Sequence, residues 1–566
     1  MTRIFTQPTT ASKGRGAVHA GPASYALGAA LILGALGALG GARLASGTPV
    51  PPPLAAAPAH GGQAHTGQQA RTGQIKHIVV ILEENRSFDN IFGQYPAADG
   101  VTTATVNLGG AQATIPLVRE PYYLSHDVGH NVGDATAAID HGKMDGFNGE
   151  TFSNLFGDMA AYQQLAPADI PNLYAYARDY VLADRAFPSV AGPTFPTHLH
   201  IVAAQDGGVA SNPQTTTNAW GCDAAAGAFV LRQVAPGRIV KTAPCFDFAT
   251  LAGSLDEAHL PWAYYAAPPS DYGYIWSALD AIKPVRNSAE WATNVRDEGT
   301  FEADARAGHL PAFSWVTPRA LASMHPPVPV CPGENWIVDK VNAVMAGPAW
   351  ASTMVVVAWD DWGGYYDHVA PPPAPAGSYG LRVPLLVISP YAKRGVVSHT
   401  LYTFESVLKT AETLWALPPL TGADKSANSL LDTLDLTQAP LSPRPLRTRA
   451  CPPALTLQSY HDVLDQQLQR VLLQELGQPL ATVQALHKRY TLAEIARFKG
   501  RDAGAVLQDL QTIDGGWSIG KNVLQLVDPT QAKADHYLDH LALDQWFNHG
   551  RGPTIFPSPL VQPPKG

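Results

Sequence analysis

The chain has 566 residues, of which 46% are hydrophobic and 9% aromatic, so it can bury a sizeable core. This composition excludes a disordered chain, a small disulfide scaffold and a collagen-like repeat. Acidic residues outnumber basic ones by 47 to 38, and the sequence contains no basic tract of the nucleic-acid-binding kind. We therefore expect a loop-rich α/β protein with no DNA or RNA partner.

The N-terminal region is typical of an exported protein. Arg3, Lys13 and Arg15 precede an apolar run over residues 25–42, and no acidic residue occurs before Glu83. A cationic start followed by an apolar stretch predicts either a cleaved signal peptide or an uncleaved membrane anchor within residues 1–47. In both cases the chain is periplasmic or secreted, and the anchor would add membrane contact. Residues 48–73, rich in Pro, Ala, Gly and Gln, predict a flexible tether.

Patterns along the remaining chain alternate between strand and helix. Short apolar runs at 75–82, 311–316, 353–359 and 383–389 predict buried parallel strands, and the segments 171–180, 336–345 and 403–417 predict helices. This alternation predicts a doubly wound α/β sheet with helices on both faces, within a domain spanning residues 74–450. Residues 451–566 predict a helical C-terminal appendage, with helices over 459–476, 491–498 and 532–548.

The chain has four cysteines, Cys222, Cys245, Cys331 and Cys451, and no CxxC pair. The spacing excludes a zinc ribbon and a thioredoxin motif. In an exported chain an even number favours disulfides, with Cys222–Cys245 preferred because it closes a short loop. The alternative is that the cysteines are buried thiols.

Acidic residues follow two of the predicted strands. The first strand leads into Glu83-Glu84-Asn85, and the strand at 353–359 leads into Asp360-Asp361. Because ligands bind at the carboxyl ends of strands in open α/β sheets, both groups lie where function is expected. Clustered carboxylates repel one another unless a cation neutralises them, so the pattern predicts a divalent metal ion of the hard or borderline kind. The alternative is that these acids cap helices or solvate loops.

Thr194 stands in the segment Gly192-Pro193-Thr194, before a run that can begin a helix at 198–204. At or just before a helix N-terminus, backbone N–H groups favour an anion. A threonine hydroxyl needs a metal ion or a base to become a nucleophile, so Thr194 is a nucleophile candidate if the metal site exists. Its alternative role is that of an N-cap.

Four histidines accompany these segments. We expect functional roles for His130, which follows Asp127, for His325 and for His368, which closes the segment that begins at Asp360. We expect a structural role for His399.

Taken together, these segments resemble the bacterial phosphoesterase family, which contains exported acid phosphatases and phosphatidylcholine-preferring phospholipases C. The matching motifs occur in the family's order across residues 75–440: 84–89 with Phe92-Gly93, Asp127 with His130, 142–147, Asp184 ahead of 192–194, 325–327, 360–364 with Asp367-His368, and 383–391.

The resemblance implies an alkaline-phosphatase-like three-layer fold and a set of site residues. The implied metal ligands are Glu84, Asn85, Thr194, Asp360 and Asp361, with the identity of the metal left open. Thr194 would also attack phosphorus and form a phosphothreonine intermediate. His130 and His325 would contact the phosphoryl group and His368 would lie close by. His325 is our first choice to protonate the leaving oxygen, which implies an acidic pH optimum. One residue departs from the family pattern, because Thr197 stands where the family usually has Asn.

Three functions follow from this set. The sequence favours an exported acid phosphatase acting on a small phosphoester, because the chain after residue 440 leaves little room for the C-terminal β-domains of longer phospholipase relatives. The second function is a phospholipase C, for which the aromatic stretch 262–276 is the candidate apolar rim, although that stretch could equally line a pocket. The third is a non-catalytic surface binding protein.

Overall fold

The structure is a computed structural model and describes residues 73–124, 126–150, 159–215, 219–236, 238–374 and 377–453. These residues belong to one compact unit, Gly62–Gly566. The predicted export segment, the predicted tether up to residue 72 and the three predicted appendage helices lie outside the described residues. Within the described part, no helix has the length and apolar character needed to cross a membrane.

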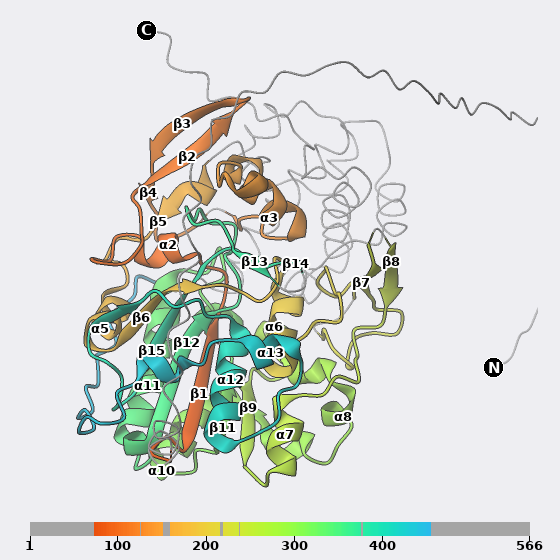
Figure 1. The fold of residues 1–566 in the computed structure, drawn as a ribbon, viewed down its shortest axis with the longest axis vertical. Coiled ribbons are helices and arrows are strands. Elements are labelled where there is room, and N and C mark those ends of the chain that lie inside the picture. Colours follow the sequence, from red (N-terminus) through yellow and green to blue (C-terminus); the bar gives the residue numbers. More distant parts are fainter. Residues whose placement is uncertain are drawn as a thin grey trace, which may run out of the picture. The chain divides into compact units, whose positions relative to one another are not determined.

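A central eight-stranded sheet organises the described part (Figure 1). Its strands, in spatial order, are β10 (Val295–Asp297), β9 (Trp262–Ala266), β11 (Phe313–Val316), β1 (His77–Glu83), β12 (Thr353–Trp359), β15 (Val383–Ile388), β6 (Val181–Ala186) and β16 (Val396–Ser398). β1 and β12 lie side by side near the middle and are buried nearly throughout, which explains their continuous Val- and Ile-rich sequences.

All four predicted strands form, but the predicted direction of the last one is wrong. Among the described strands of this sheet, only β15 runs against its neighbours, pairing antiparallel with β12 and with β6. Its sequence, VPLLVI, is buried at all six positions. A fully apolar run indicates burial on both faces of a sheet but does not indicate the direction of the strand. The sequence therefore predicted this strand correctly and its parallel direction wrongly.

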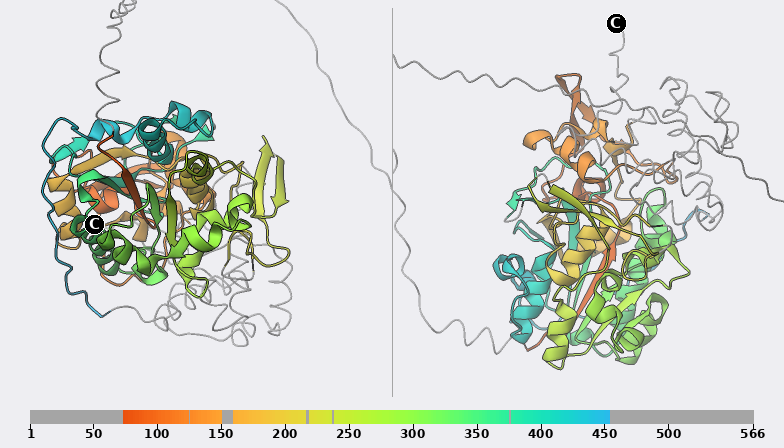
Figure 2. Two further views of the ribbon diagram at one scale, coloured as in Figure 1. Left: turned by 90° about the horizontal axis from the view of Figure 1, so that it is seen from below. Right: turned by 90° about the vertical axis from the view of Figure 1, so that its right-hand side faces the viewer.

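Helices cover both faces of the sheet, as predicted. The predicted helices appear as α5 (Pro171–Asp179), α11 (Val330–Ala346) and α12 (Phe404–Trp415). Figures 1 and 2 show α12 on one side of β1 and α10 (Phe301–Ala307) with α11 on the other, so the fold has three layers. Among the described residues, the other α-helices are α2 (Phe88–Phe92), α3 (Val132–Ile139), α6 (Thr194–Ala203), α7 (Leu251–Glu257), α8 (Lys283–Arg286), α9 (Trp291–Asn294) and α13 (Gly422–Ser426).

Short two-stranded sheets lie outside the central sheet. They are β2 (Thr103–Leu108) with β3 (Ala111–Pro116), β4 (Val118–Arg119) with β5 (Gln163–Gln164), β7 (Val230–Ala235) with β8 (Arg238–Thr242), and β13 (Pro373–Ala374) with β14 (Gly377–Ser378).

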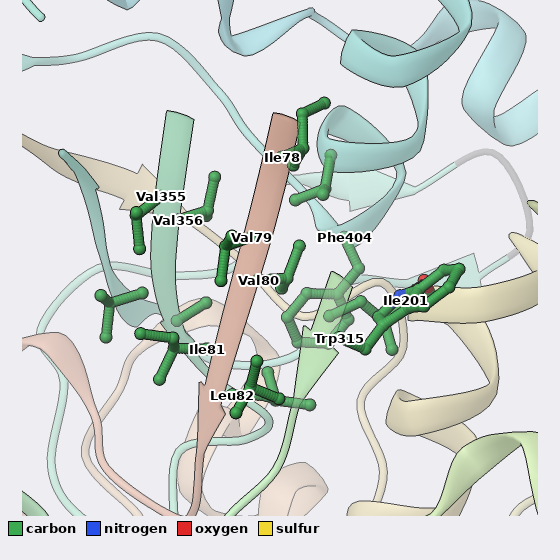
Figure 3. Packing of buried hydrophobic residues seen from close by; sticks show 14 of the residues in the cluster. Ile78, Val79, Val80, Ile81, Leu82, Ile201, Trp315, Val355, Val356 and Phe404 are labelled. Atoms are coloured by element: carbon green, nitrogen blue, oxygen red, sulfur yellow. Dashed lines mark hydrogen bonds between the residues drawn. The ribbon is translucent and has the colours of Figure 1, made fainter. Parts of the chain in front are cut away.

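The hydrophobic core joins the middle strands to the helices. Figure 3 shows Ile201 of α6, Trp315 of β11 and Phe404 of α12 gathered beside Val80 of β1. All four side chains are at most 2% exposed. Burying a side chain of this size stabilises the fold by about 1.5–3 kcal/mol. The core therefore fixes the position of α6 against the strands that carry the candidate site.

Two disulfides link the described chain. Cys222–Cys245 confirms the expected pair, and Cys331–Cys451 joins the first turn of α11 to a residue 120 positions later. The alternative of buried thiols is wrong, because all four cysteines are paired.

A buried carboxyl on α12 gives the fold a pH-dependent stability. Glu412 is 4% exposed and lies beside the Asp424 carboxylate. Burial and the nearby Asp424 carboxylate raise the pKa of Glu412 to about 8. A carboxyl whose folded pKa is raised stabilises the fold at low pH, and that stability is lost as pH rises from the unfolded pKa through about 8.

We therefore predict that Glu412→Gln leaves the melting temperature unchanged at pH 5 and raises it at pH 9. The gain at pH 9 should correspond to about 1–3 kcal/mol in the free energy of unfolding. Thermal unfolding at both pH values measures this difference. Glu257→Gln, at an exposed position of α7, is the matched control and should have no effect at either pH. Equal melting temperatures of wild type and Glu412→Gln at pH 9 would contradict the assignment.

Candidate active site

The candidate site lies at the carboxyl ends of β1 and β12. The two strands pair in parallel, with Glu83 opposite Trp359, so the residues that follow each strand are neighbours. The backbone continues the pairing, because Asp360 N donates to Glu83 O at 2.9 Å and Arg86 N donates to Asp361 O at 3.0 Å. Glu84, Asn85, Asp360 and Asp361 are each at most 1% exposed. The structure therefore brings together the four residues that the two strand ends contribute to the predicted metal site.

The turn after each strand is unusually tight. Asn85 has a positive φ of 59°, in the left-handed region that non-glycine residues rarely adopt, and its N–H donates to Asp360 Oδ1 at 3.0 Å. Gly363, with φ 61°, packs directly onto Asn85, and a Cβ at this position would collide with the Asn85 carbonyl oxygen. Glycine at this position therefore allows the segment after β12 to close over the end of β1.

Four oxygens of this cluster have no hydrogen-bond partner among the described residues. Asp360 and Asp361 each use one carboxylate oxygen to accept a backbone N–H, from Asn85 and Gly363 respectively. Their other oxygens, together with one oxygen each from Glu84 and Asn85, are buried and unpaired: Glu84 Oε2, Asn85 Oδ1, Asp360 Oδ2 and Asp361 Oδ2. The helix that follows β1 is capped by Ser87, and the acids are buried, so they neither cap that helix nor lie on a solvated loop.

The pKa values of the carboxyls in this cluster also favour a bound cation. Burial, together with the Asp360 carboxylate, raises the pKa of Glu84 and of Asp361 well above their usual values. Without a counter-charge, these carboxyls would therefore have to hold protons. Carboxylate and amide oxygens are the ligands that hard divalent cations prefer, so the residues fit the metal ion that the sequence predicts.

Thr194 is the first residue of α6 and is 3% exposed. The N-cap is Pro193, so the alternative that Thr194 is itself the N-cap is wrong. α6 follows β6, and β6 is parallel to β12 because β15 pairs antiparallel with both. Thr197, which stands in place of the family's Asn, donates its hydroxyl to Thr194 O at 2.7 Å.

His198 connects α6 to the cluster. Its Nε2 lies 3.1 Å from Glu84 Oε1 and 3.7 Å from Asp360 Oδ2. Thr194 lies one helical turn before His198 on α6. Sequence reasoning missed His198, and the available signal was a histidine one helical turn after the predicted nucleophile. Potential ligand atoms of Glu84, His198 and Asp360 all lie within 4.8 Å of one another.

His130 and His325 form an adjoining group, with ring centroids 5.5 Å apart. His130 Nδ1 lies 2.7 Å from Val128 O, and His130 Nε2 lies 2.9 Å from Asn85 Nδ2. A neutral His130 ring with its proton on Nδ1 accepts from the Asn85 amide at Nε2 and leaves Asn85 Oδ1 for another partner. With no cation at the cluster, burial lowers the pKa of His130, but the Asp361 and Asp127 carboxylates outweigh it and raise the pKa to about 9. The contact with Asn85 therefore requires that a cation first offset these carboxylates. Burial and the charge of His130 lower the pKa of His325 to about 3.

The structure does not bring His368 into this cluster. Its Nδ1 lies 2.7 Å from Asp89 Oδ2 and its Nε2 lies 3.2 Å from Asp99 Oδ1. Within the described part of the chain, no hydrogen bond joins His368 to the four strand-end residues. His399 pairs with Asp184 at 2.9 Å and its side chain is 64% exposed, in agreement with a structural role.

Comparison with known proteins identifies the family to which this chain belongs. The profile of the Phosphoesterase family matches residues 75–418, more than half of the chain. The chain therefore belongs to the phosphoesterase family, whose activity is the hydrolysis of phosphoric esters. This result does not support the alternative of a non-catalytic binding protein.

The most similar relatives include three phospholipases. Phospholipase C A of Mycobacterium tuberculosis is 26% identical over 404 residues, covering 61% of this chain and 73% of the relative. Phospholipase C B of the same species is 28% identical over 402 residues, covering 61% and 74%. Non-specific phospholipase C3 of Arabidopsis thaliana is 26% identical over 382 residues, covering 59% and 66%.

Solved structures with partial similarity include a protein in the alkaline phosphatase superfamily from Vibrio parahaemolyticus. It is 9% identical, with a TM-score of 0.31, covering 64% of this chain and 71% of that one. The phosphonate monoester hydrolase of Agrobacterium radiobacter is 12% identical, with a TM-score of 0.27, covering 63% and 77%.

Proposed function

We propose that this protein hydrolyses phosphodiesters of phospholipids at a site where Glu84, Asn85, Thr194, Asp360 and Asp361 hold a divalent cation and Thr194 is the nucleophile. The observation that carries the proposal is the set of four buried, unpaired oxygens at the ends of β1 and β12. A cluster of this kind needs a cation, and the helix that begins at Thr194 meets it through His198.

The chemistry follows from these positions. When bound, the cation supplies positive charge that lowers the pKa of a hydroxyl beside it and neutralises phosphoryl oxygens. Thr194 lies in the first turn of a ten-residue helix, where backbone N–H groups favour negative charge. Thr194 loses its hydroxyl proton to solvent, and Oγ1 then forms a bond to phosphorus as the bond from phosphorus to the leaving oxygen breaks. Water then breaks the bond from Oγ1 to phosphorus, which releases the phosphoryl group and returns a proton to the Thr194 hydroxyl.

The leaving oxygen takes a proton from His325 in this scheme. His325 Nδ1 lies 2.6 Å from Pro326 O, which leaves Nε2 to face the substrate. The pKa of His325, lowered to about 3 by burial and by His130, keeps it neutral in the free protein. A bound phosphoryl group brings negative charge next to the ring and raises this pKa, so we propose that the ring takes up a proton from water when the substrate binds. We propose no direct role for His368 in these steps.

The relatives favour a phospholipid substrate, since those compared above are named as phospholipases C. An acid phosphatase is the second candidate, and one observation favours it. The expected apolar rim at 262–276 is absent, because β9 and the 3-10 helix Tyr272–Trp276 within this stretch are buried. The protein would therefore have to meet a lipid surface through other residues.

We also propose that the protein is exported. The two disulfides are typical of an oxidising compartment outside the cytoplasm. The cationic and apolar N-terminal segment supports the same location, with or without a membrane anchor.

Removal of the cation tests the proposal. The purified protein should hydrolyse p-nitrophenyl phosphorylcholine faster than p-nitrophenyl phosphate, and dialysis against a chelator should reduce turnover by about 100-fold or more. Added divalent cations should restore it. A preference for the monoester would select the acid phosphatase instead. Undiminished turnover in protein shown by elemental analysis to be metal-free would contradict the cation-dependent scheme.

A further inference from the structure

His198 presents a ring nitrogen to the carboxylate cluster. The ring is 3% exposed, and its Nδ1 lies 3.2 Å from the backbone oxygen of Trp276. A carbonyl oxygen only accepts hydrogen bonds, so this contact places the ring proton on Nδ1. Nε2 is then left with its lone pair directed at Glu84 Oε1, 3.1 Å away, and at Asp360 Oδ2, 3.7 Å away.

Lone pairs that face one another inside a protein repel unless something positive lies between them. Here the nitrogen faces two carboxylates. The first, Glu84, retains an unpaired oxygen, Oε2. In the second, Asp360, the oxygen nearer to the ring, Oδ2, has no hydrogen-bond partner among the described residues. The arrangement also has the usual support of a metal-binding histidine, whose other nitrogen donates to a backbone carbonyl and fixes the ring. Trp276 supplies that carbonyl, and it is 1% exposed.

We propose that His198 Nε2 is a direct ligand of the cation, which gives this site a mixed nitrogen and oxygen ligand set. The proposal rests on the proposed function, since it assumes that the strand-end oxygens hold a cation. Because His198 lies one helical turn after Thr194, α6 delivers both the nucleophile and a nitrogen ligand to the same cation.

The nitrogen ligand changes which cations the site selects. Imidazole suits zinc, cobalt and related transition-metal ions, whereas magnesium and calcium bind mainly oxygen ligands. A site built from Glu84, Asn85, Asp360 and Asp361 alone would suit magnesium or calcium. With His198 added, we expect the protein to prefer the zinc class.

Metal binding by variants of the full chain tests this inference. His198→Asn should weaken Zn²⁺ binding, measured by calorimetric titration of the chelator-treated protein, by about 100-fold or more, and should change Mg²⁺ binding by less than about threefold. His309→Asn, at an exposed histidine, is the matched control and should change neither. An unchanged Zn²⁺ affinity in His198→Asn would overturn the inference.

His198→Gln separates a ligand from a positioning residue. A positioning role requires a proton on Nε2 that donates to Glu84, and the Gln amide can supply that hydrogen bond. A positioning role therefore predicts that Zn²⁺ affinity is restored, and a ligand role predicts that it stays weak. Restored affinity would overturn the inference.

A measurement on the unaltered protein covers the case in which the variants do not fold. X-ray absorption of the Co²⁺-loaded wild type should show an imidazole among the metal's neighbours, and a shell of oxygen alone would overturn the inference. Failure of the proposed function has a different outcome, in which the wild type binds none of these cations.

Discussion

Thr194→Ala is expected to reduce turnover by about 10³-fold or more, because the variant lacks the hydroxyl that attacks phosphorus. The change removes one hydroxyl and one methyl group from a side chain that is 3% exposed at the start of α6. It should therefore cost only about 1 kcal/mol of folding free energy. Steady-state rates on a p-nitrophenyl ester, together with circular dichroism of the same samples, measure both effects.

Two further variants sharpen this result. Thr194→Ser keeps a hydroxyl at the same place and should retain turnover within about tenfold of the wild type. Thr197→Ala removes a nearby hydroxyl that donates to Thr194 O, and should affect turnover far less than Thr194→Ala. Acid quenching of the wild type during turnover should trap phosphate on Thr194. Near-wild-type turnover in Thr194→Ala would contradict the nucleophile assignment.

The strand ends of the candidate site could be predicted from local patterns. A buried apolar run marks a strand, and the first polar residues after it lie at the sheet edge, whatever the order of the strands. For this reason Glu84 and Asp360 could be assigned to one cluster although they are 276 positions apart. Their adjacency depends on β1 pairing directly with β12, which the sequence alone does not encode in any short motif.

The contribution of α6 could be predicted only in part. Thr194 was recognisable because Gly-Pro precedes a helical run, but the role of His198 depends on how the whole helix packs. Its ring meets Glu84, and Trp276 meets the ring from a third segment of the chain. The spacing of His198 from Thr194 could have placed it on the same helix face, but a contact among three distant segments leaves no periodic pattern, so its partners Glu84 and Trp276 could not be found in advance.

The position of His368 shows a different limit. It follows Asp361 by only seven residues, and the family resemblance implied a place close to the same cluster. Gly363 and Gly364, both with positive φ, turn the chain between them. Beyond that turn, His368 joins Asp89 and Asp99 in an ionic cluster of its own. Glycine pairs of this kind redirect a chain within two residues, and the new direction depends on what packs against them.

That ionic cluster is centred on Arg382, which is fully buried. Its Nε lies 3.1 Å from both carboxylate oxygens of Asp367, and one terminal nitrogen lies 3.3 Å from Asp89 Oδ1. The other terminal nitrogen donates to the backbone oxygens of Asp99 and Asp184, at 2.7 and 2.9 Å. Arg382 therefore ties the segment after β1, which carries Asp89, to the segment after β12, which carries Asp367.

Arg382→Met is expected to lower the free energy of unfolding by about 3–5 kcal/mol, because it leaves the carboxylates of Asp89 and Asp367 buried without their cation. Urea unfolding followed by fluorescence measures the loss. Arg119→Met is the matched control, since Arg119 also pairs with a carboxylate but its side chain is 66% exposed, and it should leave the free energy of unfolding nearly unchanged. Equal losses in the two variants would show that burial does not set the strength of the Arg382 pairs. A loss confined to Arg382→Met would show that the buried pairs of Arg382 with Asp89 and Asp367 stabilise the fold where an exposed pair does not.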